Sequence, residues 1–167
     1  MGLTKSLNKA IKLSKGKYIA RQDADDISDI YRFEKQLKFI KNTNCKIVGT
    51  NYNIVDEKLN IISKRRIGHK KLLWLYFIIS NQIAHGSVLM EKDFILDIGL
   101  YNENIKYSQD YELWSRALAY DKKSICVLDE FLYTLRKHSK SISVQKKIEQ
   151  KKLANIIRKN LVLSLIK

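Results

Sequence analysis

The hydrophobic and polar positions along the chain predict alternating helices and short strands. Apolar residues recur at helical spacing on Leu3, Leu7, Ala10 and Ile11, and Gly16 stands where such a helix would end. A strand over residues 17–21 follows and runs directly into the acids of Asp23-Ala24-Asp25-Asp26. A helix, a glycine turn, a strand and acids at its carboxyl end form half of a doubly wound α/β unit, whose ligands bind outside the carboxyl ends of the strands. The acids are therefore predicted to lie at a binding site.

The same patterns predict the remaining elements. A helix capped by Ser28 or Asp29 is expected to bury a stripe made of Ile30, Phe33, Leu37 and Ile40. Further helices are predicted over 69–79, 91–98 and 111–120, and from 143 onward. Strands are predicted over 47–50, 52–55, 61–63, 85–90, 125–128 and 131–135, the second and third forming a hairpin. No repeat or Pro/Gly/Ser linker interrupts the chain, so we expect one domain over 1–142 and a basic amphipathic helical tail over 143–167.

Composition and charge narrow the class of protein. With 167 residues, 45% hydrophobic and 10% aromatic, the chain has the composition of a globular domain with its own core. The formal net charge is +15, and residues 136–167 hold ten Lys or Arg against one acid, Glu149. A basic tail suits an anionic membrane surface or nucleic acid better than a basic active site does. The longest apolar run covers residues 72–79, too short for a spanning helix of about 20 residues.

The two cysteines predict a compartment. Cys45 and Cys126 each lie in an apolar stretch, and they form no CxxC pair. We therefore expect two reduced thiols in or near the core, and a reducing compartment. The N-terminus lacks the apolar stretch of a signal peptide. Together these features predict a cytoplasmic protein. The basic tail either lies as a peripheral helix on the inner face of the membrane or is a solvated helix that packs its apolar side on the domain.

The acidic segment Asp23-Ala24-Asp25-Asp26 needs a compensating partner. Three carboxylates within four residues repel one another unless a cation or several hydrogen-bond donors offset their charge. Two aspartates one residue apart can offer hard oxygen ligands to Mg²⁺ or Mn²⁺, which share such sites with substrate phosphates. The alternative is a solvated acidic loop that caps the following helix. An EF-hand is disfavoured because Ile27 and Ser28 occupy its ligand and glycine positions.

A second acid lies much later in the chain. Asp110 stands at the predicted start of a helix, where it either caps the helix or acts as a general base. His138 follows a strand in a basic loop, where it is either solvated or a ligand. His85 precedes Gly86 and is a core or loop residue. The three histidines and two cysteines have no zinc-finger spacing.

Several blocks of this sequence resemble bacterial family 2 glycosyltransferases. They are residues 2–11, residues 15–26 with Asp23-Ala24-Asp25-Asp26, residues 85–90, Gln109-Asp110-Tyr111-Glu112-Leu113-Trp114-Ser115-Arg116 and residues 133–143. The blocks follow in the family's order and cover about residues 2–145. The resemblance implies an α/β, Rossmann-like GT-A fold, a nucleotide-sugar donor, a saccharide or lipid-linked acceptor in surface polysaccharide assembly, and inversion at the anomeric carbon.

The resemblance also implies roles for individual residues. Asp110 matches the catalytic base. Asp25 and Asp23, with His138, match the site of a divalent metal, Mn²⁺ or Mg²⁺, that bridges the donor diphosphate, Asp23 also lying toward the donor's sugar or ribose. The implied substrate-binding residues are Arg21, Asp26, His85, Gly86, Gln109 and Trp114.

The family's pattern begins before this sequence does. Its first strand, helix and second strand, which hold the nucleoside, have no counterpart here, so we expect an N-terminally truncated fold and weak or no donor binding by this chain alone. Two alternatives are a non-catalytic subunit that completes its sheet with a partner chain and a basic nucleic-acid-binding module. Nucleic acid is disfavoured because no RNA- or DNA-binding motif accompanies the charge.

Overall fold

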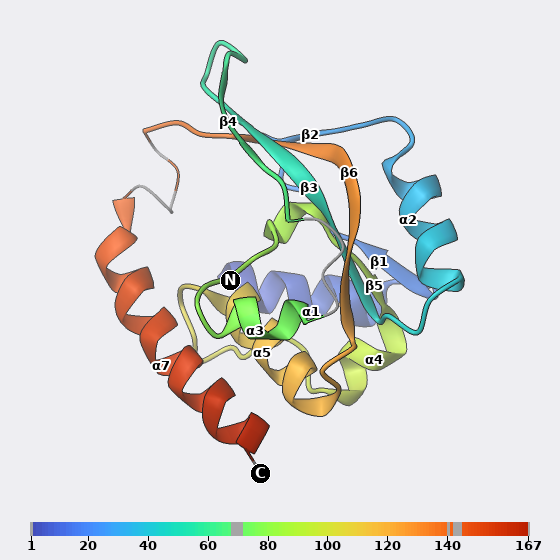
Figure 1. The fold of residues 1–167 in the computed structure, drawn as a ribbon, viewed down its shortest axis with the longest axis vertical. Coiled ribbons are helices and arrows are strands. Elements are labelled where there is room, and N and C mark those ends of the chain that lie inside the picture. Colours follow the sequence, from blue (N-terminus) through green and yellow to red (C-terminus); the bar gives the residue numbers. More distant parts are fainter. Residues whose placement is uncertain (1, 68–71, 140, 142–144, 167) are drawn as a thin grey trace.

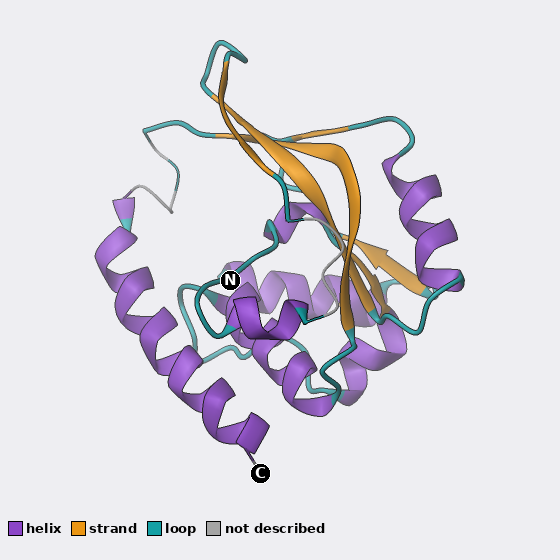
Figure 2. Ribbon diagram, in the orientation of Figure 1, coloured by secondary structure: helices purple, strands orange, loops and turns teal. Residues whose placement is uncertain are grey.

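A computed structural model describes residues 2–67, 72–139, 141 and 145–166 of the chain. Within these residues a six-stranded sheet stands between helices on its two sides (Figures 1 and 2). The predicted α/β architecture is confirmed. The expected boundary between residues 142 and 143, and the start of the predicted helix over 69–79, lie outside the described residues.

The sheet has the strand order β1-β5-β3-β6-β2, with β4 paired to β3. The strands are β1 (Tyr18–Ala20), β2 (Ile27–Ser28), β3 (Ile47–Val55), β4 (Ile61–Arg65), β5 (Leu89–Glu91) and β6 (Ile125–Arg136). Strands β3 and β6 run parallel, whereas the other described pairs are antiparallel. The predicted hairpin is confirmed as β3 and β4, and it projects from one end of the molecule (Figure 1).

The helices cover the sheet unequally. They are α1 (Leu3–Leu13), α2 (Arg32–Lys41), α3 (Leu73–Phe77), the 3₁₀ turn η1 (His85–Ser87), α4 (Lys92–Asp97), α5 (Gln109–Tyr120) and α7 (Lys147–Ile166). Helix α2 lies on one side of the sheet, and α1, α3, α5 and α7 gather on the other (Figure 1). The large core on that second side includes Ile11, Phe77, Trp114 and Leu161. A small cluster on the α2 side includes Ile40 and Val48.

Two helices bury only part of the predicted apolar stripes, and polar residues are buried beside them. In α2 the buried residues are Arg32, Gln36 and Ile40, whereas Ile30 is 86% exposed and Phe33 is 49% exposed. The predicted start was wrong as well, because Ile27–Ser28 form β2 and Asp29 closes a turn by accepting a bond from the Tyr31 N–H. Polar side chains face inward here because backbone carbonyls of distant segments accept their hydrogen bonds.

Helix α1 shows the same effect on a smaller scale. Its buried residues are Thr4, Asn8 and Ile11, whereas Leu3 and Ala10 of the predicted stripe are exposed. The Asn8 amide donates to the Tyr101 carbonyl at 2.9 Å and accepts from the Tyr101 N–H at 3.0 Å. This pair of bonds replaces two bonds to water and fixes the loop before α5 against α1.

Three strand and helix assignments are refined by the structure. The predicted strand over 85–90 divides into η1 and β5, and the two strands predicted over 125–135 form one continuous strand, β6. Helix α5 begins at Gln109, one residue before Asp110, close to the predicted start. No helix among the described residues is long and apolar enough to cross a membrane.

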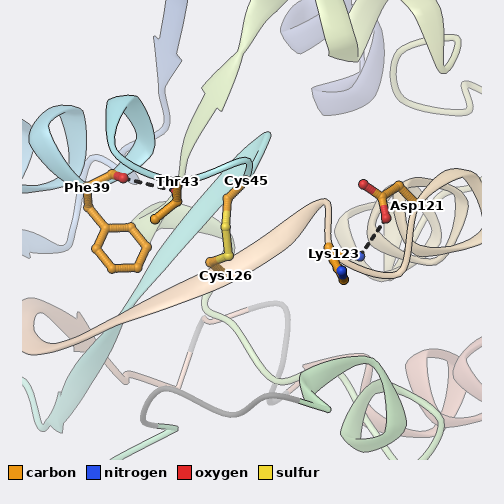
Figure 3. Close-up of a disulfide and its surroundings, with 6 residues drawn as sticks. All are labelled: Phe39, Thr43, Cys45, Asp121, Lys123 and Cys126. Atoms are coloured by element: carbon orange, nitrogen blue, oxygen red, sulfur yellow. Dashed lines mark hydrogen bonds between the residues drawn. A yellow bond between two sulfur atoms is a disulfide. The ribbon is translucent and has the colours of Figure 1, made fainter.

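The two cysteines are joined by a disulfide, so the prediction of free thiols was wrong. Cys45 lies just before β3 and Cys126 lies in β6, and the strand pairing holds their Cα atoms 5.9 Å apart (Figure 3). This separation is in the ordinary range for a disulfide. Local sequence patterns do not reveal this pairing, because the two cysteines are 81 residues apart. The cysteines therefore no longer support a reducing compartment.

Reducing the Cys45–Cys126 disulfide is expected to lower the free energy of unfolding by about 2–5 kcal/mol, because the bond restrains a long loop in the unfolded chain. Urea unfolding with and without a reductant measures this difference. The Cys45→Ser/Cys126→Ser variant should be insensitive to reductant. Two titratable thiols in the unreduced, unfolded protein would contradict the disulfide.

Candidate active site

The acidic loop that follows β1 is held by hydrogen bonds from two side chains, Gln22 and Arg32. The Gln22 amide donates to the carbonyls of Asp23 and Asp26 at 3.1 and 3.0 Å. The fully buried Arg32 donates to the Gln22 side-chain oxygen at 3.1 Å and to the Arg21 and Gly86 carbonyls at 3.0 and 2.9 Å. Buried polar groups bonded in this way hold one loop conformation. The buried face of α2 therefore supports the acids.

The three aspartates of this loop have separate partners. Asp23 accepts a charged hydrogen bond from Arg21 at 2.5 Å. Asp25 lies 3.0 Å from the His138 ring nitrogen Nε2, a contact across 113 residues of sequence. Asp26 accepts from the Tyr133 hydroxyl at 2.5 Å and from the Arg136 N–H at 2.8 Å. The mutual repulsion expected from the sequence is thus offset by a donor at each carboxylate.

The acids of the loop differ in their affinity for protons. The hydrogen bond from His138 lowers the pKa of Asp25 below its usual value. Burial raises the pKa of Asp26, although Tyr133 and Arg136 oppose that effect. Asp25 is also the more exposed of the two, with 48% of its side chain accessible. Asp25 therefore offers an exposed carboxylate whose lowered pKa favours the charged form.

Asp110 is held at the start of α5. The Asn81 amide donates to its Oδ2 atom at 2.7 Å, and burial raises the pKa of the Asp110 carboxyl. Ser108, the residue before α5, has a φ of 54°, a left-handed conformation that is uncommon for a residue with a side chain. A carboxyl with a raised pKa in a fixed orientation suits proton transfer better than surface capping.

The turn η1 contacts both the acidic loop and helix α5. Within it, His85 accepts or donates a 2.8 Å bond with the Tyr101 hydroxyl, and its ring meets the edge of Trp114 at a centroid distance of 6.2 Å. Burial lowers the pKa of His85 to about 3, so the ring is neutral near pH 7. Trp114 is fully buried and lies behind His85 as a packing partner.

Gly86 forms the closest approach in the site. A β-carbon at this position would lie 1.8 Å from the Tyr133 hydroxyl and 3.1 Å from the Asp23 Oδ2 atom. Burial is the main reason that the pKa values of Asp110 and Tyr101 are raised, and the charge of Asp23 adds to both shifts. The acidic loop, η1 and the start of α5 therefore face one region at the carboxyl end of β1.

The structure sorts the predicted site residues into groups. It brings Asp25 together with His138, Asp23 with Arg21 and Gly86, and His85 with Trp114. Gln109 is the first residue of α5, beside Asp110. Across the described parts of the chain, no three Asp, Glu, His or Cys side chains converge as a ready metal cage, so Asp23 does not join the Asp25–His138 pair.

Sequence reasoning missed four residues that build this site: Arg32, Asn81, Tyr101 and Tyr133. Arg32 and Tyr133 fall in segments read as a surface helix and a strand, and only their polar contacts reveal them. Asn81 lies in a loop without a distinguishing pattern.

A separate hollow of about 510 Å³, lined by Lys17, Lys41 and Cys45 among others, lies at the opposite end of β1, away from the acids.

Comparisons with known proteins all identify glycosyltransferases as relatives of this chain. A family model described as Glycosyl transferase family 2 matches residues 1–96. An uncharacterised glycosyltransferase of Methanocaldococcus jannaschii is 35% identical over 81% of this chain and 47% of its own length. The O-antigen biosynthesis glycosyltransferase WbnJ of Escherichia coli is 30% identical over 83% of this chain and 55% of its own length.

A solved structure has the same arrangement of elements. TarS of S. aureus, in a crystal structure of residues 1–349 with UDP-GlcNAc, matches 93% of this chain and 46% of its own with a TM-score of 0.66 at 17% identity. That likeness confirms the expected fold. The chain spans about half the length of these relatives.

Proposed function

Because the chain belongs to glycosyl transferase family 2, we propose that it carries the metal and base half of an inverting glycosyltransferase site. The donor is a nucleotide-sugar and the acceptor is a hydroxyl of a saccharide or a lipid-linked saccharide. The name of WbnJ concerns O-antigen biosynthesis, and TarS was solved with UDP-GlcNAc. These two relatives favour surface polysaccharide assembly and a uridine diphosphate donor.

The observation that carries this proposal is the 3.0 Å contact of Asp25 with His138. A carboxylate oxygen of the acidic loop and an imidazole nitrogen from the segment after β6 lie in contact, and both side chains remain partly exposed. Asp110, which is close enough to feel the charge of Asp23, is a carboxyl whose pKa is raised by burial. An exposed ion pair contributes little to stability, so a ligand could compete for both side chains at small cost.

The donor atoms fit a divalent cation that shares its coordination with a phosphate. Asp25 and His138 would hold it with one oxygen and one nitrogen, a set that Mn²⁺ accepts and Mg²⁺ accepts less readily. Two protein ligands leave further positions to water and diphosphate oxygens, as is usual for such sites. When bound, the cation supplies positive charge that stabilises the departing nucleoside diphosphate.

Asp110 is assigned the proton transfer. Its carboxylate accepts the proton of the acceptor hydroxyl as that oxygen forms a bond to the anomeric carbon and the bond to the diphosphate oxygen breaks. Attack from the face opposite the leaving group inverts the configuration. Asn81 orients the carboxylate through its 2.7 Å bond, and the neutral His85 supports the floor of the site through Tyr101 and Trp114.

Substituting the metal-site pair tests the proposal. Asp25→Asn and His138→Asn should each weaken Mn²⁺ binding in the presence of UDP by about 10–100-fold, the range for disturbed metal sites. Binding is measured from the loss of the electron paramagnetic resonance signal of free Mn²⁺. Asp97→Asn, an exposed acid on α4, is the matched control and should bind like the unchanged protein. Equal Mn²⁺ binding by all of these proteins would contradict the assignment.

One observation favours a second candidate, a subunit that works with another polypeptide. Strand β1 is an edge strand, and Lys17 and Arg21 make their backbone bonds toward β5. Because pairing alternates along an antiparallel strand, the N–H and C=O groups of Tyr18 and Ala20 face the open side. Such an edge accepts an added strand. A short companion chain that co-purifies with the protein, and restores UDP-sugar binding when added back, would support this candidate.

A further inference from the structure

Helix α7 has apolar residues on two opposite sides, and only one of them is packed. Ile157 and Leu161 are 3% and 1% exposed and join the large core against α5. Ile148, Ile156, Leu163 and Ile166 are 69%, 56%, 54% and 78% exposed. A helix that only covered the domain would keep polar residues on its outer side. The exposed apolar residues therefore require a separate explanation.

The exposed residues form a continuous face with two lysines. Ile148, Lys152, Lys159, Leu163 and Ile166 follow one another at spacings of three, four or seven residues, which places them on one side of a helix, with Ile156 beside them. We call these six residues the α7 outer face. Lys152 and Lys159 are exposed and carry no acid partner among the described ion pairs. The face thus combines exposed apolar side chains with two positive charges.

The segment around α3 contacts helix α7 and exposes apolar residues of its own. The Arg158 guanidinium donates to the Ile79 carbonyl at 2.6 Å, which fixes the end of the α3 segment against α7. Leu75, Tyr76 and Ile79 are 39%, 40% and 65% exposed. Tyrosine and aliphatic side chains beside lysines have the composition of a surface that enters the boundary between lipid headgroups and acyl chains.

The positive charge of helix α7 indicates what kind of partner binds the α7 outer face. Helix α7 holds five Lys or Arg against the single acid Glu149, and the whole chain has a net charge of +15. A second copy of the chain would bring like charges together at this face. Nucleic acid would satisfy the lysines but would leave the four aliphatic side chains in water. An anionic bilayer accommodates both kinds of side chain.

We propose that the α7 outer face, together with the exposed residues of the α3 segment, binds the surface of a membrane rich in anionic phospholipid. The aliphatic side chains enter the headgroup boundary, and Lys152 and Lys159 contact lipid phosphates. The helix lies in the plane of the membrane. This inference does not depend on the proposed sugar transfer, but it would hold the chain beside acceptors that are linked to lipid.

Vesicle flotation with matched variants tests the proposal. The unchanged chain should float with vesicles of phosphatidylglycerol and phosphatidylcholine, and should float poorly with phosphatidylcholine alone or in high salt. Ile156→Gln/Leu163→Gln/Ile166→Gln should weaken binding about 10-fold or more, and Lys152→Glu/Lys159→Glu should do the same on the anionic vesicles. Circular dichroism and urea unfolding confirm that each variant is folded.

Two control variants carry the same chemical changes elsewhere. Leu59→Gln/Ile61→Gln/Ile62→Gln alters equally exposed aliphatic residues around the β3–β4 turn, and Lys5→Glu/Lys9→Glu makes the same charge change on α1. Both should bind vesicles within about twofold of the unchanged chain, since binding depends on the local surface. Equal loss in the controls, or no difference among all variants, would overturn the proposal.

Two other results would also overturn it in favour of a different occupant. DNA binding that falls steeply with salt and with Lys152→Glu/Lys159→Glu, but not with the glutamine variant, would indicate nucleic acid. A dimer in sedimentation equilibrium that the glutamine variant abolishes, without vesicle binding by the unchanged chain, would indicate self-association.

Discussion

Replacing Asp110 with Asn is expected to lower the rate of sugar transfer about 10²–10⁴-fold, the usual contribution of a positioned general base. The amide has nearly the size of the carboxyl and can still pack at the start of α5, but it cannot take the proton of the acceptor hydroxyl. Steady-state release of the nucleoside diphosphate from the donor, with acceptor present, measures the effect. Metal-dependent donor binding should persist, because Asp25 and His138 are unchanged.

The pH dependence of the unchanged protein supplies a second readout. Burial raises the pKa of Asp110, and a base acts only when deprotonated, so the acid limb of the rate profile should lie above the usual range of an aspartate. The Asn81 bond lowers that pKa, so Asn81→Leu should move the limb to higher pH. Glu112→Gln is the control variant. Glu112 lies two residues after Asp110 on α5, but its carboxylate pairs with Arg116. Retained transfer by Asp110→Asn would remove Asp110 from the role of base.

Gly86→Ala is expected to disrupt the site and to lower the free energy of unfolding by about 1–3 kcal/mol, the cost of overpacking a filled interior. The new methyl group would lie 1.8 Å from the Tyr133 hydroxyl. Tyr133 is 1% exposed and packs against Arg32, so neither side chain has room to withdraw. Moving Tyr133 would break its bond to Asp26 and release the acidic loop.

Urea unfolding and Mn²⁺ binding in the presence of UDP measure the two consequences of Gly86→Ala. Gly2→Ala is the matched control, since a β-carbon at position 2 meets no atom within 4 Å. The control should leave both properties unchanged. Unaltered metal binding by a folded Gly86→Ala protein would show that the Gly86–Tyr133 contact does not support the site.

The sequence alone predicted the elements that depend on local patterns. The helical spacing of apolar residues located α1, α5 and α7, the alternation around residues 52–63 located the hairpin, and the strand before Asp23 placed the acids at its carboxyl end. These features follow from short-range periodicity and turn residues, which the chain displays within one or two turns. The family resemblance added Asp110 and His138 as members of the same site.

Only the tertiary structure decided which groups meet. The contact of Asp25 with His138 spans 113 residues, the Cys45–Cys126 disulfide spans 81, and the bonds from Arg32 reach Gly86 across 54. The buried face of α2 could not be read from hydrophobicity, because Arg32 and Gln36 are buried with partners on other segments. Local pattern fixes where a helix or strand forms, but burial of a polar side chain depends on donors and acceptors that the fold alone brings to it.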